Sequence, residues 1–249
     1  MAILWQQTRA GTHYEVRSAG RSLRLYSNGV FHTQYNPTQP LTGHVWDLLM
    51  LPAFFHSTQN IKRILVLGVG GGAVIHLFRH FLPHAQIVGI ELDKQHIRIA
   101  RRFFRLKHPQ IKLHQADAIT WIKTYKGEKF DLIIDDLFME KDGEPVPVVK
   151  PNVTWFSVLL KHLNKNGILV KNYIDRDSLK TSAGIAHQKT QAKFPSIFQL
   201  TSHYNENFVV AFSKQAASSQ QLRQNLRQTK GLNPDLKSCR LRYRIRRLK

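Results

Sequence analysis

The residues with the clearest chemical potential are glycines between a predicted strand and a predicted helix. The segment RILVLGVGGGAVIHLF, residues 63–78, passes from an apolar run through four glycines into a helical pattern. Glycine tolerates positive φ and lets a ligand approach the backbone closely, and a helix N-terminus offers unpaired N–H groups. Gly68, Gly70 and Gly72 are therefore candidate cofactor-binding residues.

Acidic residues follow the next two predicted strands. Glu91 is placed to accept hydrogen bonds from two ribose hydroxyls, and Asp117 to accept one from an adenine amino group, with Ala118 beside it in the predicted nucleoside site. Ligands of open α/β sheets lie at the carboxyl ends of the strands, so these groups should converge on one crevice. The glycines alone also match a dinucleotide fingerprint, whereas no Gly-Lys-Ser/Thr follows them as a P-loop requires. A ribose, an adenine and an acid near the reacting end favour an adenosyl-sulfonium cofactor.

The sequence FDLIIDD ends the fourth predicted strand with two adjacent aspartates, Asp135 and Asp136. Neighbouring residues of a strand point to opposite faces, so one should pack locally while the other faces the crevice. Alternatively, both merely end the strand. Asp135 is a candidate substrate-binding residue, and Tyr173, after the fifth predicted strand, either lines the acceptor pocket or packs in the core. The acidic segment DDLFMEKDGE, residues 135–144, is either a lip that attracts a cationic substrate or a solvated loop.

Strand and helix patterns alternate from residue 61 onward, as in a doubly wound parallel sheet. Earlier, residues 14–33 have the pattern of short strands joined by turns, and residues 43–55 that of an apolar helix. The predicted strands are 61–67, 86–91, 111–114, 130–135 and 167–173, the predicted helices are 71–81, 94–106, 117–124, 152–163 and one near 178–193, and two further strands close the sheet. We therefore predict an α/β, Rossmann-like domain over residues 56–214, after a small β-hairpin domain over 1–55 and before a basic extension over 215–249.

The chain is strongly basic, with 37 Lys and Arg against 16 Asp and Glu, a formal net charge of +21. Ten of these bases and a single acid lie in residues 215–249. Such a balance attracts polyanions, nucleic acid among them, through salt-dependent contacts. In CRLRYRIRRLK, residues 239–249, arginines alternate with apolar residues as in a strand with one basic face. This segment could add an edge strand or order on RNA or an anionic surface; a solvated extension is our default expectation.

Composition also bears on compartment and on metals. The chain has one cysteine, Cys239, which excludes an internal disulfide and a multi-cysteine metal site, and we expect no metal. No apolar run reaches the roughly 18 residues that a membrane span needs. The N-terminus lacks the pattern of a secretory signal. We therefore expect a cytoplasmic protein without a membrane span.

The order of these motifs from about residue 14 to residue 213 resembles the spermidine synthase family, polyamine aminopropyltransferases built on the fold of S-adenosylmethionine-dependent methyltransferases. The turn NGV is similar to the family's DGV, LGVGGGAV to its GGGDGG loop, IELD to VEID, ADAI to GDG or GDA, and FDLIIDD to FDVIIVD. The resemblance implies that Glu91 holds the ribose and Asp117 the adenine. It also implies that Asp136 is the catalytic carboxylate that assists deprotonation of the attacking amine, and it makes a homodimer plausible.

Two departures from the family pattern bear on the activity. The acid within GGGDGG, which binds the aminopropyl end of the decarboxylated cofactor in the family, falls on Gly71, and the family's SSDP is replaced by residues 137–140, LFME. We therefore predict that the protein transfers a methyl group from S-adenosylmethionine to an unidentified acceptor. One alternative is aminopropyl transfer from decarboxylated S-adenosylmethionine in polyamine synthesis. Another is a catalytically silent module that binds nucleic acid.

Overall fold

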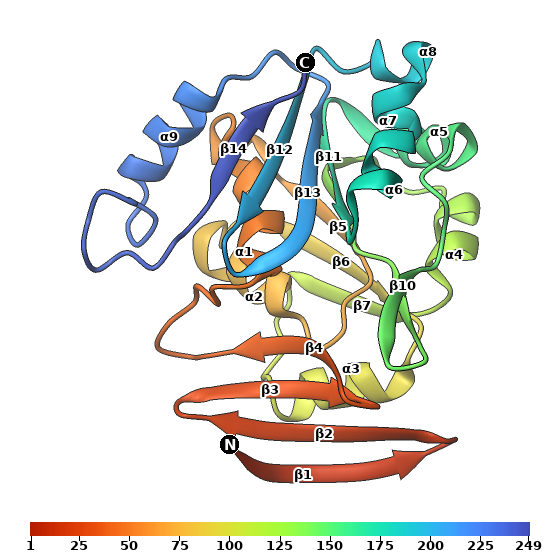
Figure 1. The fold of residues 1–249 in the computed structure, drawn as a ribbon, viewed down its shortest axis with the longest axis vertical. Coiled ribbons are helices and arrows are strands. Elements are labelled where there is room, and N and C mark those ends of the chain that lie inside the picture. The colour runs from red at the N-terminus through yellow and green to blue at the C-terminus, as the bar shows by residue number, and fades with distance from the viewer.

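The computed structural model describes residues 1–249 and contains two main β-sheets (Figure 1). The strands are β1 (Ala2–Arg9), β2 (Thr12–Ala19), β3 (Ser22–Ser27), β4 (Val30–Tyr35), β5 (Arg63–Leu67), β6 (Gln86–Glu91), β7 (Ile111–Gln115), β8 (Phe130–Asp135), β9 (Phe138–Lys141), β10 (Glu144–Pro147), β11 (Leu163–Tyr173), β12 (Ser196–Ser202), β13 (Asn205–Ser213) and β14 (Arg244–Arg247). The helices are α1 (Val45–Met50), α2 (Ala73–Phe81), α3 (Lys94–Arg102), α4 (Ala118–Thr124), α5 (Val153–Lys161), α6 (Arg176–Thr181), α7 (Ala183–Ala186), α8 (Gln188–Gln191) and α9 (Ser219–Gln228), with 3₁₀ turns at Leu51–Phe54 and Thr58–Asn60.

The larger sheet has eight strands in the order β14-β12-β13-β11-β8-β5-β6-β7. Strands β5, β6, β7, β8 and β11 are parallel, whereas β12, β13 and β14 pair in antiparallel fashion at one side. This confirms the predicted Rossmann-like sheet, because the strand–helix alternation from residue 61 requires crossover connections between parallel strands.

The large sheet is buried on both faces. Along β5, Ile64 and Val66 belong to a core shared with α1 and α2, whereas Leu65 and Leu67 belong to a core shared with α4 and α5. Successive side chains of a strand point to opposite faces, so a continuous apolar strand fits a sheet that is covered on both sides. The carboxyl ends of the parallel strands are therefore held rigidly in place.

The N-terminal sheet is a four-stranded antiparallel meander, β1-β2-β3-β4. Its last three strands confirm the predicted hairpins, with turns at Gly20 and Gly29, but β1 was missed because it is exposed along nearly its whole length and lacks a buried face. The sheet packs on α3 through a small cluster that includes Tyr14, Val16 and Phe104. It lies below the large sheet in the view of Figure 1, on the side of α3.

The C-terminal segment packs against the large sheet. Leu222 and Leu226 of α9, together with Leu232 and Leu241, are fully or almost fully buried in the main core. Strand β14 pairs with β12, so this segment adds an edge strand to the large sheet, as one of the predicted alternatives required (Figure 1). The default expectation of a solvated extension was wrong, because the apolar residues between the basic ones face the core.

Two other segments differ from the expectation. The helix predicted near 178–193 is three short helices, α6 to α8, and the acidic segment at 135–144 contains the first strand of a small hairpin, β9–β10, instead of a loop. No helix is both long enough and apolar enough to cross a membrane.

Candidate functional site

A cavity of about 380 Å³ lies at the carboxyl ends of β5, β6, β8 and β11. These ends contribute Gly68, Glu91, Asp136 and Asn172 to its wall, and β4 of the N-terminal sheet contributes His32. Its size falls within the range of small-molecule sites. The predicted convergence of the glycine loop with Glu91 and Asp136 is therefore present.

The backbone N–H groups of the glycine loop already have partners within the chain. Glu91 Oε2 accepts hydrogen bonds from the N–H groups of Val69 and Gly70, at 3.0 and 2.7 Å. A dinucleotide would place a pyrophosphate on such N–H groups. The Glu91 carboxylate occupies them and would repel a phosphate. The same carboxylate is suited to ribose hydroxyls and to a cationic ligand, so the residues present fit an adenosyl-sulfonium compound.

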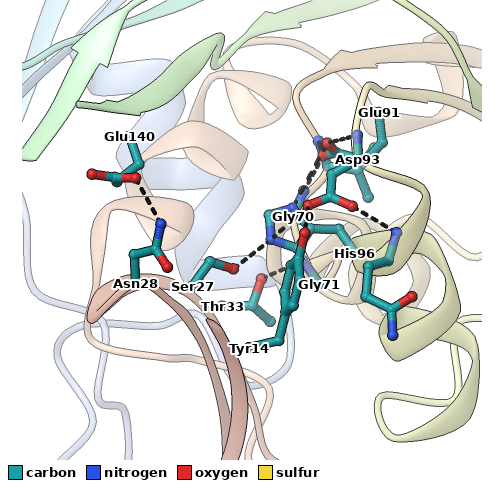
Figure 2. Close-up of polar contacts among 12 residues, drawn as sticks. Tyr14, Ser27, Asn28, Thr33, Gly70, Gly71, Glu91, Asp93, His96 and Glu140 are labelled. Atoms are coloured by element: carbon teal, nitrogen blue, oxygen red, sulfur yellow. Dashed lines mark hydrogen bonds and ion pairs between the residues drawn. The ribbon is translucent and has the colours of Figure 1, made fainter. Parts of the chain in front are cut away.

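Glu91 is the centre of a polar network that joins the two sheets (Figure 2). Its Oε1 accepts from the N–H of Asp93 at 2.9 Å and lies 3.7 Å from Nδ1 of His96. Burial alone would raise the pKa of Glu91, but the nearby His96 ring and the backbone N–H donors lower it below its usual value. The His96 ring in turn shares a hydrogen bond with Ser27 of β3, 2.8 Å from Nε2 to Oγ, and Tyr14 of β2 donates to Asp93. Glu91 is therefore ionised and fixed in place.

Thr33 of β4 occupies the space next to Gly71. The Gly71 N–H donates to Thr33 Oγ1 at 2.7 Å, and a Cβ built on Gly71 would lie 2.8 Å from the Thr33 Cβ (Figure 2). Thr33 is completely buried. Position 71 can therefore hold neither an aspartate nor any other side chain unless Thr33 moves.

Asp136, directly after the end of β8, lies in the cavity wall. Its Oδ1 accepts from Asn172 Nδ2 at 2.9 Å, and Asn207 donates to Asn172 at 3.1 Å. Burial and the charge of Asp135 raise the pKa of Asp136 to about 6, although the hydrogen bond from Asn172 opposes this shift. A carboxylate of this kind is a competent base near neutral pH. The Asp136 backbone oxygen also explains Gly68, because a Cβ there would lie 2.2 Å from it.

Asp135 and Tyr173, both predicted to bind substrate, lie outside the cavity. Asp135 is fully buried on the other face of the sheet, where its Oδ2 accepts from Trp155 Nε1 at 2.7 Å and from Lys171 Nζ at 2.9 Å. Tyr173 is buried as well, and its hydroxyl is 2.7 Å from Ser182 Oγ. The predicted substrate contacts of these two residues are wrong. Side chains alternate along β8 and β11, and at Asp135 and Tyr173 they point into the core.

Replacing Lys171 by methionine is expected to lower the free energy of unfolding by about 3–5 kcal/mol, because Asp135 would remain as a buried charge without its counterion. Chemical denaturation measures the change, and Lys180→Met, at an exposed position of α6, serves as the control with little effect. Changing both partners, Asp135→Leu with Lys171→Met, should recover part of the loss, because the buried charge is gone although Trp155 Nε1 loses its acceptor. A loss below about 1 kcal/mol for Lys171→Met would show that the pair is not buried as described.

Three other predicted cofactor-binding residues, Gly72, Asp117 and Ala118, are not part of the cavity lining. Asp117 is the N-cap of α4: it accepts from the N–H groups of Ile119 and Thr120, and the hydrogen bonds of Thr120 hold its pKa below the usual value. Ala118 is buried in the core, and Gly72 caps α2 with a φ of 91°. Their roles in ligand binding stay predictions.

Several cavity residues escaped prediction because they come from segments distant in sequence. His32, Trp46 and Asn207 carry no motif, and the β9–β10 hairpin contributes Phe138 and Met139. Burial, and then the charge of His96, lowers the pKa of His32 to about 4, so its ring is neutral at physiological pH. The hairpin is joined to the N-terminal sheet by a 2.9 Å hydrogen bond from Asn28 to Glu140 (Figure 2). The Asn-Gly pair indicated the hairpin turn in the sequence, but not its approach to the cavity.

Residues 59–231 match the family model described as "Methyltransferase domain", and the chain belongs to this family. A polyamine aminopropyltransferase of Vibrio vulnificus (strain CMCP6) is 27% identical over 136 residues, which cover 53% of this chain and 44% of that protein. An eEF1A lysine and N-terminal methyltransferase homolog of Drosophila melanogaster is 25% identical over 200 residues, which cover 75% of this chain and 29% of that protein. The chain thus spans less than half the length of these curated relatives.

Among solved structures, a probable spermidine synthase from Corynebacterium glutamicum ATCC 13032 has a TM-score of 0.73 at 19% identity, covering 92% of this chain and 89% of that one. This likeness concerns the fold alone. Within the methyltransferase domain family, the chain is spermidine synthase-like, which confirms the resemblance first indicated by its motifs.

Proposed function

We propose that the protein is a transferase that binds S-adenosylmethionine in the cavity and transfers the methyl group to a nucleophile held beside Asp136. S-adenosylmethionine supplies a methyl group made reactive by its sulfonium. Glu91 would hold the ribose hydroxyls, because its carboxylate is ionised and lies in the cavity wall next to the glycine loop. Membership in the methyltransferase domain family supports this choice of ligand.

The observation that carries the choice of methyl transfer is the contact between Thr33 and Gly71. By the resemblance to spermidine synthases, an acid at position 71 would hold the aminopropyl end of the decarboxylated ligand. This chain has glycine there, and Thr33 fills the adjacent space. Position 71 therefore lacks the carboxylate that would compensate the ammonium group of the decarboxylated ligand, which has lost its own carboxylate.

Methyl transfer makes modest demands on the remaining residues. The nucleophile must lie in line with the sulfonium methyl group, and its proton needs an acceptor. As the carbon–sulfur bond breaks, its electron pair stays on sulfur, which becomes a neutral thioether, and the nucleophile forms the new bond to carbon. Asp136 takes the proton of the nucleophile, and Asn172 keeps the Asp136 carboxylate oriented.

The identity of the released nucleoside tests this proposal against aminopropyl transfer, which the position of Asp136 and the Vibrio relative favour. The purified chain is incubated with S-adenosylmethionine or its decarboxylated form, together with RNA, basic and acidic peptides, and putrescine. We expect S-adenosylhomocysteine from the first ligand in the presence of one acceptor class. Formation of 5′-methylthioadenosine from the decarboxylated ligand and putrescine would overturn the proposal.

A further inference from the structure

The arginines of the C-terminal segment form a row along the edge of the large sheet. Arg240, Arg242, Arg244 and Arg246 are all exposed, whereas the residues between them, Leu241, Tyr243 and Ile245, are buried in the core or packed against it. Residues two apart in an extended chain lie about 7 Å from each other. Strand β14 is held by its pairing with β12 (Figure 1). Arg244 and Arg246, two residues apart in β14, are therefore fixed about 7 Å from each other, and Arg240 and Arg242 come directly before this strand.

None of these four arginines has an acidic partner. The only ion pair within the C-terminal segment joins Arg227 to Asp235. Arg242 donates from Nη1 to the carbonyl oxygens of Cys239 and Leu241, which orients its side chain without neutralising it. An exposed line of uncompensated guanidinium groups matches an anionic polymer, because arginine pairs bidentately with phosphate.

The row begins beside the mouth of the cavity. A groove of about 300 Å³ is lined by Arg240 and Arg242 on one side and by Gln34 and Asn36 of the N-terminal sheet on the other. Tyr204, in the β12–β13 turn, lines both this groove and the cavity, and it is 69% exposed. The arginine row, the groove and the cavity are therefore one continuous surface.

We infer that this surface binds single-stranded nucleic acid, with phosphates along the arginine row and a base stacked on Tyr204 at the mouth of the cavity. Aromatic side chains and basic grooves are the two elements by which proteins hold single strands. The side-chain amides of Gln34 and Asn36 offer hydrogen-bonding groups to a base or a sugar in the groove. That the bound strand carries the methyl acceptor rests on the proposed function; the binding itself does not.

Charge alone would also fit an acidic protein, but two observations favour nucleic acid. Four exposed arginines stand at alternate positions of one segment, and a single strand presents its phosphates at regular intervals. The aromatic ring of Tyr204 is left exposed where that line reaches the cavity, and an acidic peptide offers it no planar partner. Unpaired bases, by contrast, stack on exposed aromatic side chains.

Fluorescence anisotropy with a labelled single-stranded RNA of mixed sequence tests the inference. The variant Arg240→Gln/Arg244→Gln is expected to bind RNA at least tenfold more weakly and to reduce the salt slope by about 1.4, because two phosphate contacts are lost. The matched control, Lys126→Gln/Lys129→Gln, makes the same change of charge at exposed positions before β8 and should lose less than about threefold. Tyr204→Ala should lose about tenfold with its salt slope unchanged, because stacking is not ionic.

Three results would overturn the inference: no binding of RNA by the wild-type protein, an equal loss in the lysine control, or competition by polyglutamate as effective as by RNA. Thermal unfolding of each variant checks that it is folded, and the single variant Arg240→Gln, outside any strand, provides a second measurement if the double variant is unstable. RNA binding is measured without S-adenosylmethionine. Failure of the transferase proposal would therefore leave this inference standing, and the reverse also holds.

Discussion

Replacing Asp136 by asparagine is expected to lower the rate of methyl transfer by about 10²–10⁴-fold, the usual contribution of a general base. Asparagine keeps the size of the side chain and its hydrogen bond with Asn172, but it cannot take a proton. Affinity for S-adenosylmethionine should change little, because Asp136 faces the acceptor. Release of S-adenosylhomocysteine measures the rate, and calorimetric titration measures the affinity.

The pH profile identifies the role of Asp136 more sharply than the rate alone. Its pKa is raised to about 6, so the carboxylate needed as a base forms as the pH rises through 6. We expect the wild-type rate to climb through that value and the residual rate of Asp136→Asn to lack this limb. A wild-type profile that is flat between pH 5 and 8 would contradict the assignment. Asp177→Asn, at an exposed position of α6, is the matched control and should behave as the wild type.

The substitution Asp136→Asn lowers the rate of methyl transfer, but it should stabilise the folded chain at high pH. A carboxyl group with a raised pKa binds its proton more tightly in the folded chain than in the unfolded chain, so folding loses stability as the pH rises from about 4 to about 6. The carboxamide that replaces this group does not titrate. The variant Asp136→Asn should therefore melt at a higher temperature than the wild type at pH 8 and close to it at pH 4.

Replacing Glu91 by glutamine is expected to weaken binding of S-adenosylmethionine by about 10–100-fold, because charge-assisted hydrogen bonds to the ribose are lost. A glutamine has one acceptor oxygen instead of two. It can keep the hydrogen bonds from Val69 and Gly70 or the one from Asp93, but not both sets. The glycine loop should therefore loosen as well. Calorimetry gives the affinity.

The control for Glu91 is Glu128→Gln, which removes a carboxylate that is 79% exposed and distant from the cavity. It should bind S-adenosylmethionine as the wild type does. Equal affinity in Glu91→Gln would mean that the ribose does not lie at the end of β6, and the ligand would then have to enter the cavity in another orientation.

The sequence was informative wherever a local pattern fixes local structure. The alternation of apolar strands and helices from residue 61 predicted the parallel sheet, and the glycines with Glu91 and Asp136 predicted where the cavity opens. The resemblance of FDLIIDD to the family's FDVIIVD indicated that Asp136, and not Asp135, faces the cavity. Alternation in residues 240–246 predicted a strand with one basic side, although not that it would pack on the core.

What the sequence could not predict depends on contacts between distant segments. Nothing local shows that Thr33 fills the space beside Gly71, because the two are 38 positions apart, Thr33 on β4 and Gly71 in the loop after β5. Strand β1 was not predicted because it has no buried face. The choice between pocket and core stayed open for Tyr173, because only the folded chain shows that Ser182 partners its hydroxyl in the core. In each case the deciding quantity is burial, which only the folded chain defines.

The most direct test of the account is a calorimetric titration of the wild-type protein with S-adenosylmethionine, its decarboxylated form and 5′-methylthioadenosine. The cavity has no acid at position 71, and the basic chain favours a ligand that carries a carboxylate. We predict tighter binding of S-adenosylmethionine than of the decarboxylated form, by about tenfold or more. Tighter binding of the decarboxylated form, or no binding of any of the three, would contradict the account.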